Sequence, residues 1–378
     1  MNAVLLFISR KAYYNKGSFM KFHDEVISLY PLFFRPVYKE RIWGGRKLSE
    51  KYHRNLPDGK IGESWEIACL QNGMGIIANG SLKGFSLKDA IDKYGEELLG
   101  SAVYQDPYRR FPLLIKILDA SDVLSVQVHP DNQYAALHEN GGSGKTEMWY
   151  VIDAEPGARL VYGVRRGISR EEFRSSLEQG KLEDCLRELE VKPGDVLYIP
   201  AGLVHAIGAG ILICEIQQSS DTTYRVYDWN RVDADGRPRQ LHKEKALDVI
   251  DFEGRYTGSA LPGLTLEEEG GRRTLYVACD YFAMEKLEID GSMKLCLDGK
   301  RFQTLTCVEG SAVIQYEGGS ENLASGSSCL IPASLNPFVL KGNGTVIRAY
   351  VPDKESNVLD PLRKRGYTEK DWSVIAGL

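Results

Sequence analysis

The chain has 378 residues, a formal net charge of −5 and a sequence pI of about 5.8. This length exceeds the usual size of one domain, so we expect one large or two medium domains with a substantial core. Because the chain is mildly acidic and has no basic block, its composition argues against a protein that binds nucleic acid. An anionic substrate would therefore need a local basic pocket.

The cysteines indicate a reducing compartment. There are seven of them, scattered along the chain, and none forms a Cys-x-x-Cys pair. No apolar run approaches the roughly 20 residues needed to span a bilayer. Residues 1–9 are apolar but lack the charged start and the small-residue cleavage site of a signal peptide. We expect a cytoplasmic protein that does not bind membranes.

The first third of the chain predicts strands and one clear helix. Residues 32–38 are β-prone, and the glycine pair within residues 42–46 predicts that the strand is broken there. Residues 65–68 alternate as a strand does. Ser86 with Asp89 resembles a capping box, and it begins a helix with an apolar face that stops at Gly100.

Lys116 interrupts an apolar run, residues 112–118, that predicts a buried strand. A lysine in such a place can extend along the surface from the end of the strand. Alternatively, it points into a polar cavity, where it would hold a phosphate group. The run itself does not decide between the two interpretations.

Residues 124–205 hold a set of side chains suited to one metal ion. Gln127 and His129 are two apart in a β-prone run and would point to the same face of a strand. Glu147 begins a second β-prone run, and His205 ends a third. Imidazole nitrogen with carboxylate oxygen suits Zn²⁺, or Fe²⁺ and similar ions. A single histidine on a strand is more often structural, so spacing alone leaves both interpretations open.

Helical patterns interrupt the strands after the first histidine. Residues 131–140 predict a helix that leads into the glycine-rich loop 141–144, and no helix follows that loop as a P-loop would require. Ser169 with Glu172 caps a further helix, and a second short helix is expected to run to about Glu188. These helices form an insertion over about residues 168–190, and strands resume in residues 191–200.

An internal repeat relates two parts of the chain. Residues 194–205 align with residues 326–337 at their Gly, Ile, Pro-Ala and Leu positions. Pro337 in the second copy stands where His205 stands in the first. The first copy resembles the second motif of the cupins, so the second unit resembles a cupin that has lost its metal site. Strands such as residues 311–316, with glycine-rich turns between them, support a small β-sandwich there.

Several motifs, in order, resemble the type I mannose-6-phosphate isomerases in their short bacterial form. The resemblance covers the chain from about residue 29 to its end. It rests on several motifs that occur in the same order as in the family. They are residues 38–45 (Tyr-Lys-Glu-Arg-Ile-Trp-Gly-Gly), 62–67 (Gly-Glu-Ser-Trp-Glu-Ile), 127–131 (Gln-Val-His-Pro-Asp), 145–147 (Lys-Thr-Glu), 200–205 (Pro-Ala-Gly-Leu-Val-His) and 220–229 (Ser-Asp-Thr-Thr-Tyr-Arg-Val-Tyr-Asp-Trp).

The resemblance implies a mainly β fold with two cupin-type β-barrels, or jelly rolls. Residues 29–250 would form the catalytic cupin domain with its helical insertion, and residues 251–378 a second, degenerate cupin domain without metal ligands. Residues 1–28 would be an N-terminal extension, either a flexible tail or the result of an upstream start site. The chain is expected to be a monomer that acts on a hexose phosphate.

The resemblance also implies one Zn²⁺ per chain, bound by His129, Glu147 and His205. Gln127 would be a weaker fourth ligand or would lie behind the ligands, since an amide is a poor zinc ligand. With the metal in place, the expected reaction interconverts mannose 6-phosphate and fructose 6-phosphate by proton transfer through an enediol.

Arg225 matches the active-site arginine of the family, and its planar charge suits an enediolate oxygen or a phosphate. Lys145 matches the family's Lys-x-Glu pair and would bind substrate oxygen or act as a base. Lys116, Trp43 and Trp65 are candidates for substrate binding, although the two tryptophans are equally suited to the core.

The base that moves the proton is not assigned by the sequence. The candidates are Glu63, Glu66, His53, Lys145 and Asp221. Two other functions compete with the isomerase. One is an iron-dependent cupin oxygenase that uses the same ligands, and it leaves Arg225 and Lys145 without a clear role. The other is a non-catalytic sugar-phosphate-binding protein that has kept the fold.

Overall fold

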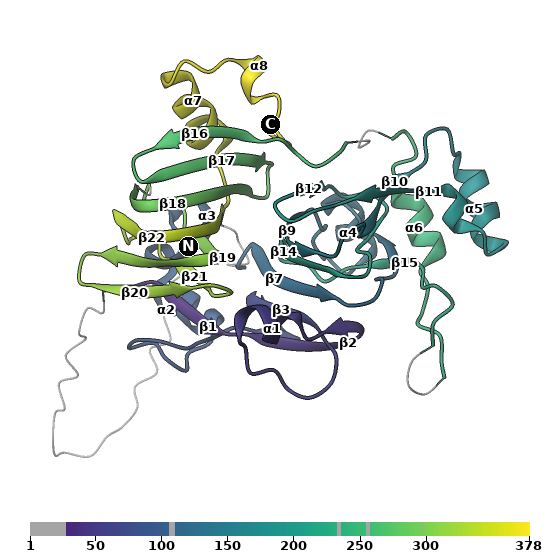
Figure 1. Cartoon of the computed structure of the whole chain (residues 1–378), viewed down its shortest axis with the longest axis horizontal. Helices are drawn as coiled ribbons and strands as arrows, with labels where there is room; N and C mark the ends of the chain where they lie inside the picture. The colour runs from purple at the N-terminus through teal and green to yellow at the C-terminus, as the bar shows by residue number, and fades with distance from the viewer. Residues whose placement is uncertain (1–27, 106–109, 233–235, 255–257, 297) are drawn as a thin grey trace, which may run out of the picture.

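The computed structural model describes residues 28–105, 110–232, 236–254, 258–296 and 298–378. Within them the chain is mainly β, as the sequence predicts, and its strands form three large sheets (Figure 1). The predicted N-terminal extension lies outside the described residues except for Ser28. In the part of the chain that the structure describes, no helix is both long and apolar enough to cross a membrane.

Two of the sheets belong to the first half of the chain. The six-stranded sheet has the order β12-β9-β14-β7-β2-β3, and the five-stranded sheet has the order β11-β10-β13-β8-β15. Their strands are β2 (Val37–Gly45), β3 (Ile61–Ile67), β7 (Leu113–Ala120), β8 (Val126–Val128), β9 (Glu147–Ala154), β10 (Arg159–Val164), β11 (Leu186–Glu190), β12 (Val196–Ile199), β13 (His205–Ala206), β14 (Ile211–Gln218) and β15 (Tyr224–Tyr227).

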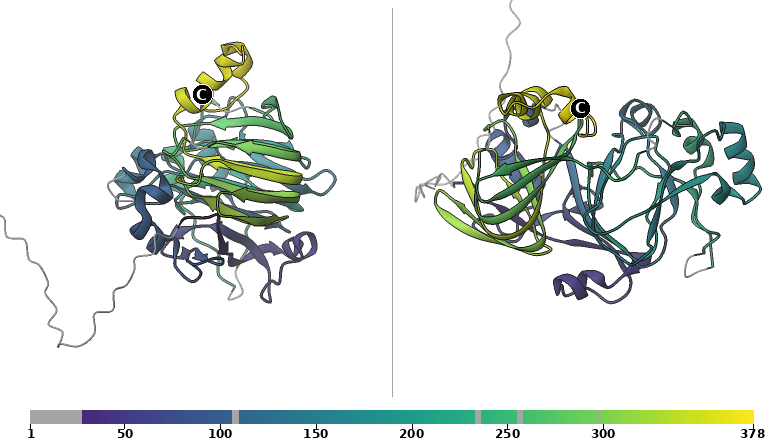
Figure 2. Two further views of the ribbon diagram at one scale, coloured as in Figure 1. Left: turned by 90° about the vertical axis from the view of Figure 1, so that its left-hand side faces the viewer. Right: turned by 45° about the horizontal axis from the view of Figure 1, so that its top comes forward.

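The third sheet is formed mainly by the C-terminal part of the chain. Figure 2 shows its strands, green to yellow, stacked as one curved sheet beside the teal strands of the first half. The strands are β16 (Leu264–Glu268), β17 (Gly271–Ala278), β18 (Ala283–Leu295), β19 (Gln303–Tyr316), β20 (Gly319–Ala324), β21 (Ser328–Ile331) and β22 (Phe338–Tyr350). Two early strands, β1 (Leu32–Arg35) and β6 (Ile76–Ile77), complete it, because β1 pairs with β21. A separate short hairpin joins β4 (Cys69–Leu70) to β5 (Gly73–Met74).

The helices have 13 residues or fewer in the part of the chain that the structure describes. Helices α5 and α6 pack on the outer face of the five-stranded sheet through Phe173, Leu177 and Leu247. The helices are α1 (Lys47–Tyr52), α2 (Leu87–Leu99), α3 (Ser101–Tyr104), α4 (Asn132–His138), α5 (Arg170–Glu178), α6 (Lys243–Val249), α7 (Asp360–Lys364) and α8 (Glu369–Trp372), with the 3₁₀ helix η1 (Leu182–Cys185) and the π-helix η2 (Lys354–Leu359).

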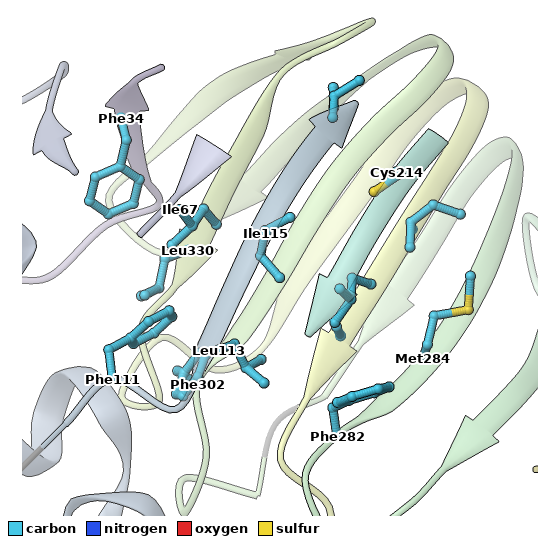
Figure 3. Close-up of a cluster of buried hydrophobic side chains, with 14 of the residues drawn as sticks. Phe34, Ile67, Phe111, Leu113, Ile115, Cys214, Phe282, Met284, Phe302 and Leu330 are labelled. Atoms are coloured by element: carbon cyan, nitrogen blue, oxygen red, sulfur yellow. The ribbon is translucent and has the colours of Figure 1, made fainter. Parts of the chain in front are cut away.

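Strand alternation divides the six-stranded sheet between two cores. On β7, Ile115 and Ile117 belong to the apolar cluster that also holds Phe302 and Met284 of the C-terminal part of the chain. Figure 3 shows Ile115 in this cluster. The residues of opposite parity, Leu118 among them, face the five-stranded sheet. Because successive strand residues point to opposite faces, one parity joins the two halves of the molecule and the other lines the space between the first two sheets.

The glycine pair at residues 44–45 does not break its strand, contrary to the prediction. Strand β2 continues through both glycines and pairs with β3 and β7, with register shifts along the way. A Cβ on Gly44 would lie 2.4 Å from the backbone nitrogen of Gly62. Gly44 therefore allows the backbones of β2 and β3 to approach closely. The prediction takes the glycine pair as a sign of a turn.

The predicted second helix of the insertion is also wrong. Only the 3₁₀ turn η1 follows α5, and residues 186–190 form β11, which pairs with β10. Leu189 packs against the core while Glu188 and Glu190 are exposed. An alternation of period two favours a strand over a helix.

Both predicted helix starts are confirmed. The Ser86 hydroxyl accepts from the Asp89 backbone N–H, and the Asp89 carboxylate accepts from the Ser86 backbone; Ser169 and Glu172 make the same pair of bonds. Each capping box satisfies backbone donors that a helix leaves unpaired at its first turn.

The internal repeat corresponds to a repeated strand order. The order β12-β9-β14-β7 in the first half recurs as β21-β19-β22-β18 in the second. The two aligned motifs contain β12 and β21, which occupy corresponding places in the two orders; β12 is at the edge of its sheet, whereas β21 also pairs with β1. The repeat is therefore structural, with each middle strand, β14 or β22, held between two long neighbours.

Candidate metal centre and substrate pocket

Three buried side chains from both sheets of the first half meet in one place. His129 follows β8, His205 begins β13 and Glu147 begins β9. Their candidate ligand atoms all lie within 4.8 Å of one another. His129 Nε2 is 3.3 Å from Glu147 Oε1, and His205 Nε2 is 3.9 Å from Glu147 Oε2. The fold thus gathers the three residues that the sequence predicts as metal ligands.

Backbone carbonyls orient both imidazoles. His129 Nδ1 lies 3.0 Å from the carbonyl oxygen of Thr222, and His205 Nδ1 lies 2.8 Å from that of Leu203. An N–H at each Nδ1 donates to its carbonyl, so each Nε2 carries the lone pair and faces Glu147. Burial, and then the Lys145 ammonium, lowers the pKa of His129 to about 3; burial also lowers the pKa of His205. Both imidazoles are therefore neutral, as a metal ligand must be.

The Glu147 carboxylate is ionised and only partly satisfied. Its Oε2 accepts from the Trp149 indole N–H at 3.1 Å, whereas its buried Oε1 accepts no hydrogen bond. The Lys145 ammonium contacts Oε1 and lies 3.2 Å from His129 Nε2. Burial would raise the pKa of Glu147, but Lys145 and His129 hold it well below its ordinary value. A buried carboxylate oxygen beside two imidazole nitrogens that carry lone pairs fits a divalent cation such as zinc.

Gln127 lies beside these ligands, as the sequence suggests. It sits in the middle of β8, where its backbone pairs with His205 on one side and Arg225 on the other. Its amide N–H donates to His205 Nε2 at 3.3 Å. The amide is thus adjacent to His205, one of the three proposed ligands.

A cavity of about 590 Å³ opens next to the metal-capable residues. Gln127 and Lys145 connect the cavity to the three metal-capable residues. Both line the cavity, and they contact His205 and His129, respectively. The sequence-predicted residues that line it are Trp43, Trp65, Lys116, Gln127, Lys145 and Arg225, and two of the candidate bases, Glu63 and Asp221. The two tryptophans are also buried core residues, so their two predicted roles do not exclude one another.

Lys116 points into this cavity. It is 6% exposed, and its ammonium donates to Glu215 Oε1 at 3.0 Å and to Gln217 Oε1 at 2.7 Å. Burial would lower the pKa of Lys116, but Glu215 and Glu63 raise it. Of the two interpretations of this lysine, the structure supports the polar cavity.

Arg225 is held at the cavity wall by a hydroxyl and a backbone carbonyl. Its Nε donates to Ser125 Oγ at 3.3 Å, and its NH1 donates to the Gln240 carbonyl at 2.9 Å. The neighbouring Asp228 instead pairs with Arg231 and Arg239. The guanidinium of Arg225 is therefore available to an anionic group in the cavity.

The structure separates the candidate bases. Glu63, Lys145 and Asp221 line the cavity, whereas Glu66 and His53 are outside its lining. Glu66 accepts from Arg54 at 2.7 and 3.0 Å, and His53 is exposed at the end of α1. Glu66 and His53 therefore do not line the cavity in which the proton would be transferred.

Glu215 is a cavity residue that the sequence interpretation missed. It lies on β14, opposite Lys116 of β7, and accepts from Trp149 Nε1 at 2.9 Å. Burial and the nearby Glu147 raise the pKa of Glu215, whereas Lys116 and Arg41 outweigh burial and lower that of Glu63. A glutamate inside the apolar run 211–216 was the available signal, of the same kind as Lys116. Arg41, Arg239 and His242 also line the cavity and were not predicted.

Comparisons with known proteins bear on both halves of the chain. Residues 32–147 match the family model "Phosphomannose isomerase type I, catalytic domain", and residues 272–351 match "Mannose-6-phosphate isomerase, cupin domain". The second match agrees with the predicted cupin character of the C-terminal half.

Curated relatives and a solved structure cover most of the chain. A mannose-6-phosphate isomerase of Bacillus subtilis is 40% identical over 321 residues, 85% of this chain and 99% of the relative. One from Streptococcus mutans is 38% identical over 320 residues, 85% of this chain and 98% of the relative. The crystal structure of the mannose 6-phosphate isomerase from Bacillus subtilis aligns with a TM-score of 0.78 at 35% identity, covering 84% of this chain and 99% of the other.

Proposed function

Because the chain belongs to the type I phosphomannose isomerase family and is an enzyme of the mannose-6-phosphate isomerase class, we propose that it interconverts mannose 6-phosphate and fructose 6-phosphate with one divalent metal ion. The reaction moves a proton between C1 and C2 of the open-chain sugar through an enediol. The observation that carries the proposal is that His129, Glu147 and His205 converge beside a cavity lined by cationic side chains.

Zinc is the proposed ion, held by His129, Glu147 and His205, because two neutral imidazoles and one carboxylate form a common catalytic zinc set. The Glu147 Oε1 atom, which accepts no hydrogen bond and is contacted by the Lys145 ammonium, supports this assignment together with the two Nε2 atoms that carry lone pairs. Gln127 is the proposed fourth, weaker ligand. When bound, the ion would act as a Lewis acid for the oxygens of the sugar that gain charge in the enediol.

The cavity suits a hexose phosphate in size and charge. A volume of about 590 Å³ lies in the range of small-molecule sites. Arg225 is proposed to bind an oxygen that is negative in the intermediate or in the phosphate. Lys116 and Lys145 are proposed to hold further substrate oxygens, and Trp43 and Trp65 to form apolar walls.

The proton at C1 or C2 needs a group that accepts it and returns it. Glu63 and Glu215 both line the cavity, and their surroundings move their pKa values in opposite directions. Such a pair suits acid–base work. Lys145 and Asp221 also line the cavity, so these four residues are the proposed set for substitution.

The proposed division of labour follows the two halves of the chain. Residues 29–250 would form the catalytic cupin domain, since they carry the proposed ligands and most of the cavity wall. Residues 251–378 would form the second cupin domain, which supports the first through their shared apolar core. A cytoplasmic location is proposed for the enzyme.

A coupled assay tests the function. Purified protein is given mannose 6-phosphate, and fructose 6-phosphate is measured before chelation, after chelation and after Zn²⁺ is added back. Turnover that chelator removes and zinc restores would support the reaction and the metal together. Binding of hexose phosphate without turnover would favour the non-catalytic alternative, and oxygen uptake with iron would favour the oxygenase.

A further inference from the structure

We propose that the second half of the chain carries its own ligand site, for a small anion that also bears hydroxyl groups. The site is a cavity of about 270 Å³ at the inner face of the nine-stranded sheet, under η2 and α7. Among the residues that line it are Arg273, Arg301, Gln303, Arg348, Tyr350 and Asn357. It has no residue in common with the lining of the first cavity.

The new cavity lies beside a charged cross-strand pair that corresponds, in the strand order, to a pair at the first cavity. In the first half, Glu215 on the middle strand β14 lies opposite Lys116 on β7. In the second half, Arg348 on the middle strand β22 lies opposite Glu285 on β18. Each pair is buried and joined by an ion pair, 3.0 Å in the first case and 2.6 Å in the second. The repeated fold therefore places a charged cross-strand pair twice, with the signs exchanged.

Two buried polar atoms at this site lack partners among the described residues. Gln303 is 7% exposed and Arg348 is 5% exposed. The Oε1 atom of Gln303 and the Nε atom of Arg348 have no hydrogen-bond partner. Burying an unpaired polar group is unfavourable, so a ligand that offers both an acceptor and a donor would be stabilised here.

The remaining groups favour an anion with hydroxyl groups. The lining contains three arginines and one aspartate, Asp298, which accepts from Asn357 at 3.2 Å and pairs with Arg301. Behind the arginines, Glu285 accepts from Tyr350 at 3.0 Å, and Glu268 lies 3.0 Å from Arg273 Nε. Arginine forks bind planar carboxylates and phosphates, and the Gln303 carbonyl needs a hydroxyl or amine donor. A sugar acid and a sugar phosphate share this chemistry.

A π-helix forms part of the wall. Ser356 and Asn357 of η2 line the cavity, and Pro361 follows in α7. π-helical turns are rare and occur often at functional sites. The cavity thus combines a buried charged pair, two unpaired atoms and an irregular helix.

Calorimetric titration of the full chain tests the proposal. The probes are glucitol 6-phosphate and gluconate, which cannot be isomerised at a carbonyl, with neutral glucitol as the probe without charge. All titrations use the Arg225→Gln variant, in which we expect anions to bind more weakly in the first cavity. They are made with and without the further substitution Gln303→Met. Gln315→Met, on an exposed position of the same strand, is the matched control.

We expect one or both anions to bind, glucitol not to bind, and Gln303→Met to weaken binding at least about fivefold while Gln315→Met does not. Binding of gluconate would identify a carboxylate ligand, and binding of glucitol 6-phosphate a phosphate ester. Arg348→Gln should weaken binding further, but it unpairs Glu285, so Gln303→Met is the decisive variant. Both Gln303→Met and Arg348→Gln, made without Arg225→Gln, should keep turnover of mannose 6-phosphate within about twofold.

The proposal would be overturned if neither anion bound below about 10 mM, or if binding were the same with and without Gln303→Met. In that case the cavity would be a structural network of ion pairs. Because these titrations measure binding in a variant of the first cavity, they do not depend on the isomerase assay.

Discussion

At the scale of single residues, the geometry of the candidate metal centre depends on the hydrogen-bond partner of each polar atom. Backbone carbonyls fix the tautomers of His129 and His205, and Trp149 holds one oxygen of Glu147. The candidate ligand atoms of the three residues then lie within 4.8 Å of one another. The chemistry of the proposed site therefore rests on partners as much as on the ligands themselves.

Removing a proposed ligand should remove the metal and the activity together. We expect His129→Ala to lower zinc occupancy and to reduce turnover at least about 100-fold, while circular dichroism stays unchanged. His53→Ala, at an exposed histidine outside the cavity, is the control. Full activity of the chelated His129→Ala variant would show that the ligand set is misassigned.

Arg225→Ala should act on turnover and not on the metal. Because its guanidinium is proposed to meet a negative oxygen of the intermediate, we expect kcat to fall about 100-fold or more with zinc content unchanged. Metal analysis and steady-state kinetics measure the two effects. Arg166→Ala, at an exposed arginine, is the control, and an unchanged kcat in Arg225→Ala would place Arg225 outside the chemistry.

Asp228 should make stability depend on pH in a defined direction. Burial would raise its pKa, but Arg239 and Arg231 outweigh burial and lower it below the ordinary 3.8. The folded state therefore binds fewer protons than the unfolded state, so this contribution is present above about pH 4 and is lost as pH falls below it. Urea unfolding at several pH values should show the difference between wild type and Asp228→Asn shrinking as pH falls. A difference that stays constant down to pH 3 would contradict this assignment.

At the scale of elements, caps and strand parity determine what each segment presents. Helix α2 buries Leu87, Ile91 and Leu98 after a capping box. Strand β7 presents Lys116 to the cavity and Ile115 to the other half of the molecule. Because successive side chains of a strand point to opposite faces, one face of β7 lines the cavity and the other packs against the second half of the chain.

The N-terminal cap of α2 should make a measurable contribution to the free energy of unfolding. Ser86→Ala removes the acceptor of the Asp89 backbone N–H, and we expect the free energy of unfolding to fall by about 1 kcal/mol. Chemical denaturation measures the change, and Ser81→Ala, at an exposed serine in the preceding turn, is the control. Equal stability of the two variants would mean that the cap contributes nothing.

At the scale of the whole molecule, one apolar layer joins the halves. Phe302 of the second half is buried and lies 4.9 Å, ring centre to ring centre, from Phe111 of the first. The same layer holds residues of β7, β9 and β14 against β18 and β22 (Figure 3). The proposed catalytic sheet is therefore supported from behind by the second half.

Phe302→Ala should destabilise both halves together. We expect a loss of about 3–5 kcal/mol for removing a buried aromatic ring, seen as a single unfolding transition at lower temperature. Calorimetry measures it, and Phe85→Ala, at a residue that is 38% exposed, is the control. Two separate transitions would indicate that the layer does not couple the halves.

The sequence by itself determined the local features of this protein. The capping serines, the apolar runs of the strands, the internal repeat and the choice of His129, Glu147 and His205 as proposed metal ligands all came from the sequence. Each depends on neighbouring residues or on a short motif, and such patterns act over a few residues.

Only the tertiary structure decided which distant groups meet. Glu215 reaches Lys116 across 99 positions of the chain, and β1 joins the sheet of the C-terminal half. Gly44 is needed for contact with Gly62, and β11 forms because β10 offers it a partner. The physical reason is the same in each case: strand pairing and burial of charge are settled between segments that lie far apart in the sequence.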